Sequence, residues 1–534
     1  MADYFLANSG SDSNSGLVGH PWQTLSKWNS TSIANDTLTM AAETFSGTLQ
    51  VKSGQRIGTG RNVSAPFPDF FTGDTWTVQT NPATISFASA NGFEAFDVEG
   101  FWLDNIAFVG GGMNTAPGIG GSLTSSQATN KLTGLRFTAL SFTQSKDALF
   151  LLIDNGKKGW DDFQFWNIWV HHCQRLGLYV TNNGTFASGT EDQCSNFYLG
   201  GGSIFEDLPG LAGGTGVGNC GQGATLCNTT TGLIDGVLAR RINEFGDQGS
   251  GGTGGIIVAR CNGIVVNVPE IHDIYAPQPV PTDGVGVDFE GGARNCTLIG
   301  PYIHDCHGAA FLTGTFVAAA TTGNKIICAV MARNNIKGHQ AEIYNFGGHG
   351  AGASTNVQTA IENCTVYASN GDAYVTDPTG AHQEDSIYTS QLISAAGAFC
   401  VNGLLNGLIG CDYHAIGGGG IKVRVNGTTY TSLATLRAAG FEQVGGVNYG
   451  VFGDPLLNDP TGPTGSTLPD NPVSTIANYN FPVTSPAYKA GWNFGLAPTV
   501  LDFRGNQAVS GGLCDIGAVS VSGQTARGGS GGFP

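Results

Sequence analysis

A phrase of similar residues recurs in the middle of this chain at a spacing of about 30 positions. Residues 262–273 spell Asn-Gly-Ile-Val-Val-Asn-Val-Pro-Glu-Ile-His-Asp, and residues 295–305 end in the same Ile-His-Asp, 32 positions later (305 − 273). Looser copies occupy residues 166–173, 328–335 and 364–370. A short apolar strand that ends in a polar cluster cannot bury its own apolar face, but stacked copies bury it between them. The repeat therefore predicts a solenoid of short parallel strands.

Composition agrees with many short strands joined by tight turns. Of the 534 residues, 83 are glycine, and only 12% are charged. Helices favour Ala, Leu, Glu and Lys, whereas a chain rich in Gly, Val, Ile, Phe and Asn favours strands and turns. We therefore expect an all-β fold, in which one solenoid takes up a length that would otherwise suggest several domains.

The net charge is −17 and the sequence pI is about 4.8. This balance disfavours nucleic acid and anionic membrane surfaces as partners, because both require a basic footprint. It leaves an acidic polysaccharide open, since a local arginine or Ca²⁺ ion can override the overall field. No apolar run approaches the 18 or so residues of a membrane span, and residues 1–25 show no signal peptide. Either a leader is cleaved away, or the protein leaves the cell by another route, such as the release of a virion by lysis.

Twelve cysteines are present, without a Cys-x-x-Cys pair that would suggest a zinc ribbon. Four of them recur at similar places in the repeat and are predicted to be small buried thiols inside the coil. Cys220 and Cys227 are the best local candidates for a disulfide. The four recurring cysteines are Cys261, Cys296, Cys328 and Cys364.

Both ends of the chain carry motifs of one known superfamily. Residues 3–16 contain Asp-Tyr-Phe-Leu and Gly-Ser-Asp-Ser-Asn-Ser-Gly, and Pro-Trp-Gln-Thr-Leu follows at 21–25. Near the other end stand Ser-Pro-Ala at 485–487, Asp-Phe-Arg-Gly at 502–505 and Asp-Ile-Gly-Ala at 515–518. Together with the repeat, these segments resemble the right-handed parallel β-helix proteins of the pectate-lyase-like superfamily. The resemblance implies a capped coil and leaves the chemistry open.

We therefore expect a single-stranded right-handed parallel β-helix of about a dozen coils. Its predicted parts are an N-terminal cap and first coil at 1–35, the β-helix at 36–375 with lateral loops near 210–255, and late coils at 376–460. A helix is expected at 432–440, because an Ala-rich apolar stretch there ends at a glycine. Residues 461–534 would form the C-terminal cap and a flexible tail. The sequence leaves the oligomeric state open, and a homotrimer is one candidate assembly.

The strongest candidate site is acidic. If residues 287–290 form a strand, Asp288 and Glu290 point to the same face, with Cα atoms about 7 Å apart. Two carboxyl groups at such a separation suit the acid and base of a glycosidase, and their mutual repulsion would raise one pKa. With Asp283 they could instead bind Ca²⁺. A solvated acidic strand face remains the third interpretation.

Histidines form the second candidate cluster. His172, His272 and His304 are expected to stack on successive coils, and His304, with Asp305 and His307 beside it, would assist catalysis or bind substrate. The alternative is a ladder of polar side chains that satisfy backbone groups at a turn.

Arg294 is a further candidate, and its role is implied by the resemblance. Lyases of this fold use an arginine or lysine as base. By this resemblance Arg294 could act as the base or contact substrate, and the alternative is an ordinary surface arginine.

Aromatic residues crowd the segment 160–169. They would stack on sugar rings if exposed, but we expect them to fill the core.

The leading functional hypothesis is a polysaccharide-degrading enzyme, hydrolase or lyase, that acts in a groove around residues 240–350 and is extracellular or virion-associated. This hypothesis requires no cofactor, and Ca²⁺ is the one possible addition. The alternative is a non-catalytic virion or surface spike that binds glycans or serves only as a rigid rod. Phage tailspike depolymerases combine both.

Overall fold

A computed structural model gives the coordinates of the chain. It describes residues 2–59, 68–70, 81–113, 118–182, 192–211, 220–246, 252–276, 283–349, 353–354, 356–376, 385–388, 391–394, 397–417, 420–461, 477–491, 509–510 and 513–514. The chain divides into two compact units, residues 1–256 with 260–264 and residues 257–259 with 265–534. The strands β22 (Gly254–Ala259) and β23 (Asn262–Asn267) contribute residues to both.

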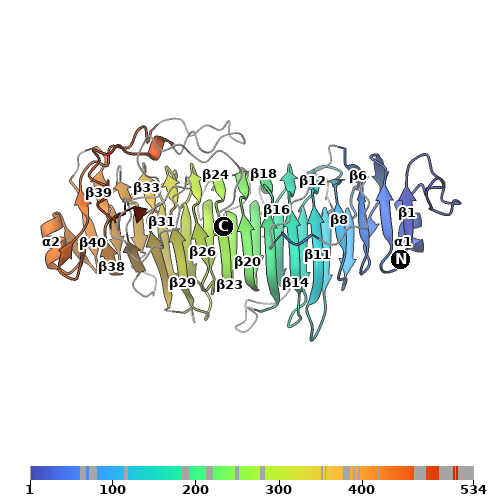
Figure 1. The fold of residues 1–534 in the computed structure, drawn as a ribbon, viewed down its shortest axis with the longest axis horizontal. Helices are drawn as coiled ribbons and strands as arrows, with labels where there is room; N and C mark the ends of the chain where they lie inside the picture. The colour runs from blue at the N-terminus through green and yellow to red at the C-terminus, as the bar shows by residue number, and fades with distance from the viewer. Residues whose placement is uncertain are drawn as a thin grey trace. The chain divides into compact units, whose positions relative to one another are not determined.

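Unit 1 consists of three sheets whose strands alternate along the chain, so that hydrogen-bonded neighbours come from consecutive coils (Figure 1). The first sheet contains, in order, β1 (Asp3–Leu6), β2 (Thr37–Met40), β5 (Arg56–Thr59), β8 (Trp102–Asp104), β11 (Leu132–Thr138), β14 (Trp160–Trp166), β17 (Cys194–Gly200) and β20 (Thr229–Asp235). The second contains β4 (Leu49–Gln50), β7 (Phe93–Phe96), β10 (Gly121–Ser125), β13 (Leu149–Ile153), β16 (Leu176–Asn182) and β19 (Gln222–Cys227). The third contains β3 (Thr44–Ser46), β6 (Ala83–Ser86), β9 (Ile106–Val109), β12 (Ser141–Thr143), β15 (Trp169–His171), β18 (Ile204–Leu208) and β21 (Leu238–Ile242).

Unit 2 repeats the same arrangement. Its first sheet contains β26 (Thr297–Ile299), β29 (Thr321–Ile327), β32 (Val357–Glu362), β35 (Asp385–Tyr388) and β38 (Leu405–Ile409). The second contains β25 (Val285–Glu290), β28 (Phe311–Thr315), β31 (Ile343–Gly348), β34 (Tyr374–Thr376), β37 (Val401–Gly403), β40 (Val423–Val425) and the antiparallel β41 (Thr428–Tyr430). The third contains β24 (Glu270–Ile274), β27 (Tyr302–His304), β30 (Val330–Ala332), β33 (Thr365–Ala368), β36 (Gln391–Ser394), β39 (Asp412–Ala415) and β44 (Val451–Phe452).

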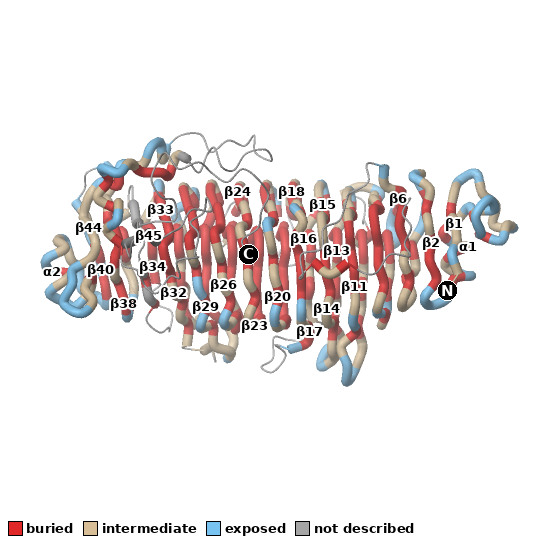
Figure 2. The backbone as a smooth tube through the Cα atoms, in the orientation of Figure 1, coloured by how far each residue is buried: buried red, intermediate tan, exposed pale blue. Residues whose placement is uncertain are grey.

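The strand pairing confirms the predicted parallel β-helix. His272 on β24 pairs with His304 on β27, and Val265 pairs with Thr297, so the register equals the 32-residue spacing of the repeated phrase. Three parallel sheets that face one another bury their inner side chains, as the buried strands in Figure 2 show. In unit 1 the core contains stacked phenylalanines from successive coils: Phe137 lies on Phe165 with ring centroids 4.6 Å apart.

The remaining elements lie around the sheets. Helix α1 (Leu25–Thr31) begins at Thr24, whose side chain accepts a hydrogen bond from the Lys27 N–H, and it buries Leu25 and Trp28. Helix α2 (Leu433–Ala438) begins after Ser432 in the same way, as predicted. The other elements are the hairpins β42 (Gln443–Val444) with β43 (Val447–Asn448) and β45 (Val509–Ser510) with β46 (Leu513–Cys514), and the 3₁₀ helix η3 (Ala477–Tyr479). No helix among the described residues is long and apolar enough to span a bilayer.

Two expectations need correction. Much of the segment predicted as lateral loops, near 210–255, belongs to the coil wall, because β19, β20 and β21 are regular strands there with many buried residues. Cys220 and Cys227 are both buried, and neither forms a disulfide. The extended β19 separates them by about 20 Å at ~3.3 Å per residue, whereas a disulfide needs Cα atoms within about 7 Å. The four recurring cysteines are buried thiols that take no part in a disulfide, as predicted. The C-terminal motifs at 502–505 and 515–518 lie outside the described residues.

Candidate functional site

The predicted acidic pair lies on one strand and on one face of it. Asp288 and Glu290 belong to β25 and are separated by the fully buried Phe289. Their carboxyl groups are hydrogen-bonded to each other, which requires both side chains to project from the same side of the strand. The strand and the shared face were both predicted from the alternation of residues. Direct contact brings the two groups closer than the 6.5–9.5 Å that leaves room for a water in an inverting glycosidase.

The pair differs from the prediction in its exposure. Asp288 is only 5% exposed, and Glu290 is partly buried, so Glu290 is the member nearer to the surface. Asp288 is in register with Leu312 on β28, which packs in an apolar cluster with Val285, Ala309 and the partly buried Tyr344 and Phe346. The strand beside β25 thus carries a large apolar side chain at the position that pairs with Asp288. Asp288 therefore does not face water as expected.

Burial is the main cause of the electrostatic state of the pair. It raises the pKa of Asp288 well above its ordinary value, and the negative charges of Glu290 and Asp283 raise it further. Burial and Asp283 also raise the pKa of Glu290. Asp288 Oδ1 has no hydrogen-bond partner among the described residues, so charging this carboxyl would cost additional free energy. The pair consequently holds at least one proton at neutral pH.

This state predicts a particular pH dependence of stability. A carboxyl group whose pKa is raised by folding binds its proton more tightly in the folded chain, so folding stability falls as pH rises from the ordinary value near 4 toward the folded pKa. For each such group the free energy of unfolding should fall by up to about 1.4 kcal/mol per pH unit in that window. Denaturant midpoints between pH 5 and 8 should show a shallower slope for Asp288→Asn than for the wild-type chain. Parallel slopes would contradict the assignment.

Two of the predicted histidines stack on each other. The rings of His272 and His304 lie 4.8 Å apart at an angle of 8°. Each Nδ1 is hydrogen-bonded to the carboxylate of the next residue, at 2.8 Å for Asp273 and 2.9 Å for Asp305. Both aspartates have a φ of +54°, a conformation that aspartate tolerates and that turns each carboxylate back toward its histidine. Burial is the main cause that lowers the pKa of His304, so this ring is neutral at pH 7.

The third histidine of the predicted stack is not on an adjacent coil. His172 lies in unit 1, directly after the last residue of β15, His171. His171 pairs with Glu206 on the next coil, and Glu206 pairs with Arg240 on the coil after that, so neither neighbouring position carries a histidine. On the far side of the histidine pair in unit 2, Ala332 is in register with His304. The stack therefore contains two histidines, because the equivalent positions carry other residues.

The structure also separates residues that were predicted to act together. Asp288 and Glu290 lie on the second sheet, whereas His304 ends a strand of the third. His307 Nδ1 accepts a hydrogen bond from the Ala276 N–H at 3.1 Å, and Asp305 binds Arg333 at 3.0 Å. Arg294 is partly buried in the turn after β25.

One group of side chains could hold a metal ion, and sequence reasoning did not identify it. Ligand atoms of Glu270, His272 and His304 all lie within 4.8 Å of one another, the one such group of three in the described part of the chain. The spacing of Glu270 and His272 in the repeated phrase was the available signal. Calcium binding by Asp283, Asp288 and Glu290 stays a prediction.

An exposed aromatic surface on unit 1 was also missed. Trp160, Phe163 and Phe165 are buried as expected, but Trp169 is 43% exposed. Its indole stacks on His171 with ring centroids 4.0 Å apart, and its Nε1 donates a hydrogen bond to Glu206 at 2.9 Å. Glu206 in turn is paired with two arginines, Arg240 at 2.7 Å and Arg241 at 2.8 Å. We name Trp169, His171, Glu206, Arg240 and Arg241 the Trp169 surface.

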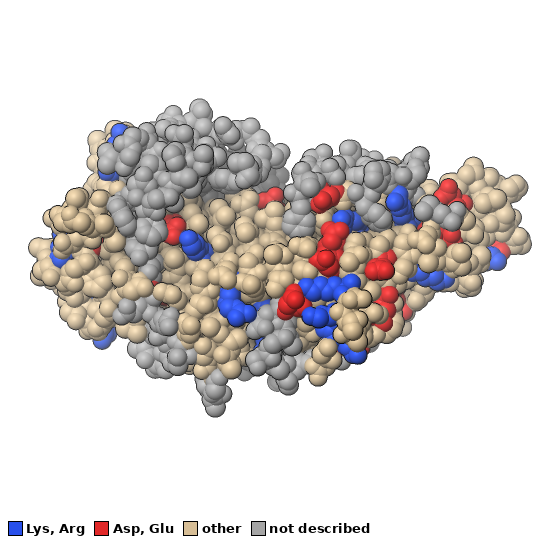
Figure 3. All heavy atoms as spheres, turned by 60° about the horizontal axis from the view of Figure 1, so that its bottom comes forward, with Lys and Arg blue, Asp and Glu red and all other residues tan. Residues whose placement is uncertain are grey.

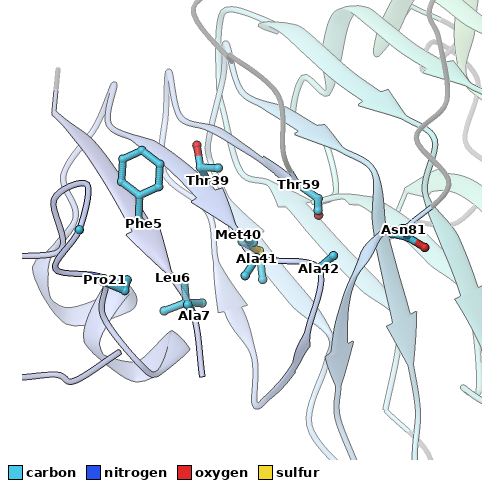
Figure 4. A pocket seen from close by; sticks show the side chains of 11 residues that line it. Phe5, Leu6, Ala7, Pro21, Thr39, Met40, Ala41, Ala42, Thr59 and Asn81 are labelled. Carbon is cyan, nitrogen blue, oxygen red and sulfur yellow. The ribbon is translucent and has the colours of Figure 1, made fainter. Parts of the chain in front are cut away.

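Charge is otherwise sparse, and a cavity in unit 1 is lined by uncharged residues. On the face that Figure 3 draws, basic side chains stand beside acidic ones, with wide uncharged areas around them. A cavity of about 550 Å³ lies against the N-terminal strands, lined by small and apolar residues such as Phe5, Met40 and Ala41 (Figure 4). Among the described residues, no acidic or basic side chain lines it. This cavity offers no catalytic group.

Comparisons with known proteins find similar solved structures at low sequence identity. No protein-family model and no curated protein matches the chain. Among solved structures, a GH136 lacto-N-biosidase from Eubacterium ramulus shares 12% identity over 74% of this chain and 64% of that chain, with a TM-score of 0.43. The enzymatically active domain of tailspike protein 2 from bacteriophage CBA120 shares 11% identity over 67% and 43%, with a TM-score of 0.34. Pectate lyase Pel9A shares 12% over 98% and 96%, with a TM-score of 0.32.

The chain thus spans less than two thirds of the lacto-N-biosidase, which it matches over 64% of its length. The strand pairing described above defines the class of the protein, a parallel β-helix, and the superfamily to which the sequence motifs point includes the pectate lyases. Identities of 11–12% leave the reaction open.

Proposed function

We propose that this protein degrades a polysaccharide, with Glu290 as the acid–base group that contacts substrate and Asp288 as its proton-sharing partner. The observation that supports this is the hydrogen-bonded carboxyl pair on β25, whose two pKa values are both raised by burial. A carboxylic acid that keeps its proton near neutral pH can donate it to a leaving oxygen. Glu290 is the partly exposed member and therefore the one that substrate can reach.

The pair is compatible with two reactions. In hydrolysis, the protonated carboxyl gives its proton to the glycosidic oxygen as the bond from this oxygen to the anomeric carbon breaks. A water molecule adds to that carbon and returns a proton to the carboxylate pair. In β-elimination, a base removes the proton on the carbon beside the uronate carboxyl group and the leaving oxygen receives one. Arg294, Asp305 and His307 stay predicted substrate contacts, and Ca²⁺ at Asp283, Asp288 and Glu290 would neutralise a uronate. We place the protein outside the cell or on a virion.

A panel of bacterial and plant polysaccharides tests this proposal. Each polymer is incubated with the protein and assayed at once for new reducing ends and for the absorbance of unsaturated uronates. Reducing ends without the absorbance identify a hydrolase, and both signals together identify a lyase. A parallel incubation with a calcium chelator shows whether Ca²⁺ is needed. Absence of both signals across a panel that includes neutral and acidic polymers contradicts the enzymatic proposal.

The Trp169 surface supplies a separate prediction about binding. Sugar rings stack on exposed indoles, and polar groups beside the ring fix their orientation. Trp169→Ala should lower the affinity for a polysaccharide that the wild-type chain binds by about tenfold, equivalent to the ~1.4 kcal/mol expected of one stacking contact. Affinity electrophoresis in polysaccharide-containing gels measures this. Phe96→Ala, which removes a 65% exposed aromatic ring elsewhere in unit 1, is the matched control and should leave affinity unchanged.

The second candidate function is a non-catalytic spike that binds glycans. The low exposure of Asp288 favours it, because a buried carboxyl group also serves to fix one strand in place. Retention of a polysaccharide in affinity electrophoresis without any cleavage in the panel would support this function over the first.

A further inference from the structure

The two stacked histidines of unit 2 present unused ligand atoms to a common space. His272 and His304 are each 2% exposed, and each Nε2 is buried without a hydrogen-bond partner among the described residues. A buried ring nitrogen without a partner is unfavourable, and a bound ion would satisfy it. Because β24 and β27 are adjacent parallel strands, both nitrogen atoms project from the same sheet face one coil apart.

A carboxylate completes the group. Glu270 lies on β24 two residues before His272 and therefore on the same face of the strand. Its ligand oxygen and the two histidine nitrogens lie within 4.8 Å of one another. Bonds of about 2.0–2.2 Å to a common ion would join atoms about 3–4 Å apart, so binding draws the three side chains slightly inward.

The surroundings of the histidines are those of metal ligands. Since Asp273 and Asp305 hold the two Nδ1 atoms, the lone pairs left for an ion are on Nε2, and each carboxylate makes its imidazole a better donor. Arg333 fixes Asp305 by a 3.0 Å ion pair. Tyr302 packs 4.5 Å from the His304 ring and is itself covered by Tyr479.

We propose that Glu270, His272 and His304 bind a divalent first-row transition-metal ion. Imidazole nitrogens suit Zn²⁺, Co²⁺, Ni²⁺ and Fe²⁺, whereas Ca²⁺ and Mg²⁺ take oxygen ligands. Two histidines and one carboxylate leave coordination positions open for water or another small ligand. This site is separate from the acidic pair, which lies on another sheet, and it is independent of the proposed function.

Cobalt provides the direct test, because Co²⁺ bound to nitrogen and oxygen ligands absorbs visible light. The purified chain is stripped with a chelator, dialysed and titrated with Co²⁺ and with Zn²⁺. We expect one ion per chain by elemental analysis, a visible band that saturates at one equivalent and is removed by Zn²⁺, and a melting temperature that rises with Zn²⁺ concentration. Absence of stoichiometric binding of both ions overturns the proposal.

Variants assign the ligands. His304→Gln and Glu270→Gln should each weaken Co²⁺ binding at least 100-fold, and Asp273→Asn, which removes only a positioning group, about 10- to 100-fold. His307→Gln is the matched control, because its ring lies on the same coil as His304 and binds the Ala276 N–H instead. Unchanged Co²⁺ affinity in the first two variants overturns the assignment even if the chain binds metal. Circular dichroism of each stripped variant establishes that it is folded, and polysaccharide cleavage is measured separately.

Discussion

Replacing Glu290 by Gln should lower any polysaccharide cleavage by at least ~100-fold while leaving the fold intact. A general acid or base contributes about 10²- to 10⁴-fold to a rate, and glutamine retains the shape of a protonated glutamate without the proton to give. Because burial already favours the protonated form of Glu290, the amide should fit the same place in the folded chain. Initial rates with the best polymer of the panel, together with melting temperatures, measure both effects.

The control for this variant is Glu94→Gln. Glu94 is also a glutamate of the second sheet, on β7 of unit 1, where its carboxylate accepts hydrogen bonds from Gln50 and Asn91 rather than sharing a proton with another acid. Its replacement should leave the cleavage rate within twofold. Asp288→Asn should also reduce the rate, since it changes the group that shares the proton. Full activity in both Glu290→Gln and Asp288→Asn would eliminate the pair as the catalytic centre.

Truncation of Phe137 to Ala should destabilise unit 1 by about 3–5 kcal/mol, the range for removing a buried aromatic side chain without refilling its space. Phe137 is fully buried and contacts three rings: Phe165 at 4.6 Å, Phe101 at 5.4 Å and Phe93 at 6.1 Å between centroids. Rings contributed by neighbouring coils cannot collapse into the space, because hydrogen bonds of the parallel sheets hold the coils apart.

Urea unfolding followed by circular dichroism measures this loss as a lower midpoint. Phe96→Ala, already the binding control, serves again, since a ring that is 65% exposed should change stability by no more than about 0.5 kcal/mol. A Phe137→Ala midpoint equal to that of the wild-type chain would show that the ring stack contributes nothing to the stability of the coil.

The fold could be predicted because the information is repeated along the chain. The Ile-His-Asp spacing of 32 residues equals the register in which His272 pairs with His304, so sequence periodicity translates directly into strand pairing. Departures from the repeat were harder to interpret. A glycine- and threonine-rich composition suggested loops near 210–255, but small residues also suit strands, and β19 and β20 occupy much of that segment.

The site was predicted less completely, for a physical reason. The alternation of residues determines which side chains share a face of one strand, and it placed Asp288 beside Glu290. It does not determine which side chains neighbouring coils place beside that face, so the burial of Asp288 next to Leu312 was unforeseen. The same limit applies to Trp169, whose exposure depends on the short side chain of Ser141, its partner on one neighbouring strand, and on Ile204, its partner on the other.

The paired strands β24 and β27 are offset by one whole coil of 32 residues, and this offset determines how such a molecule can change in length. Duplication of a 32-residue segment in the region of β24 and β27 would add a layer whose strands find the same partners and whose histidines extend the existing column. Loss of a single residue inside a strand would turn each following side chain in that strand to the opposite face. Gene rearrangements that add or remove complete windings are therefore tolerated, and the number of windings is free to vary between descendants of one ancestor.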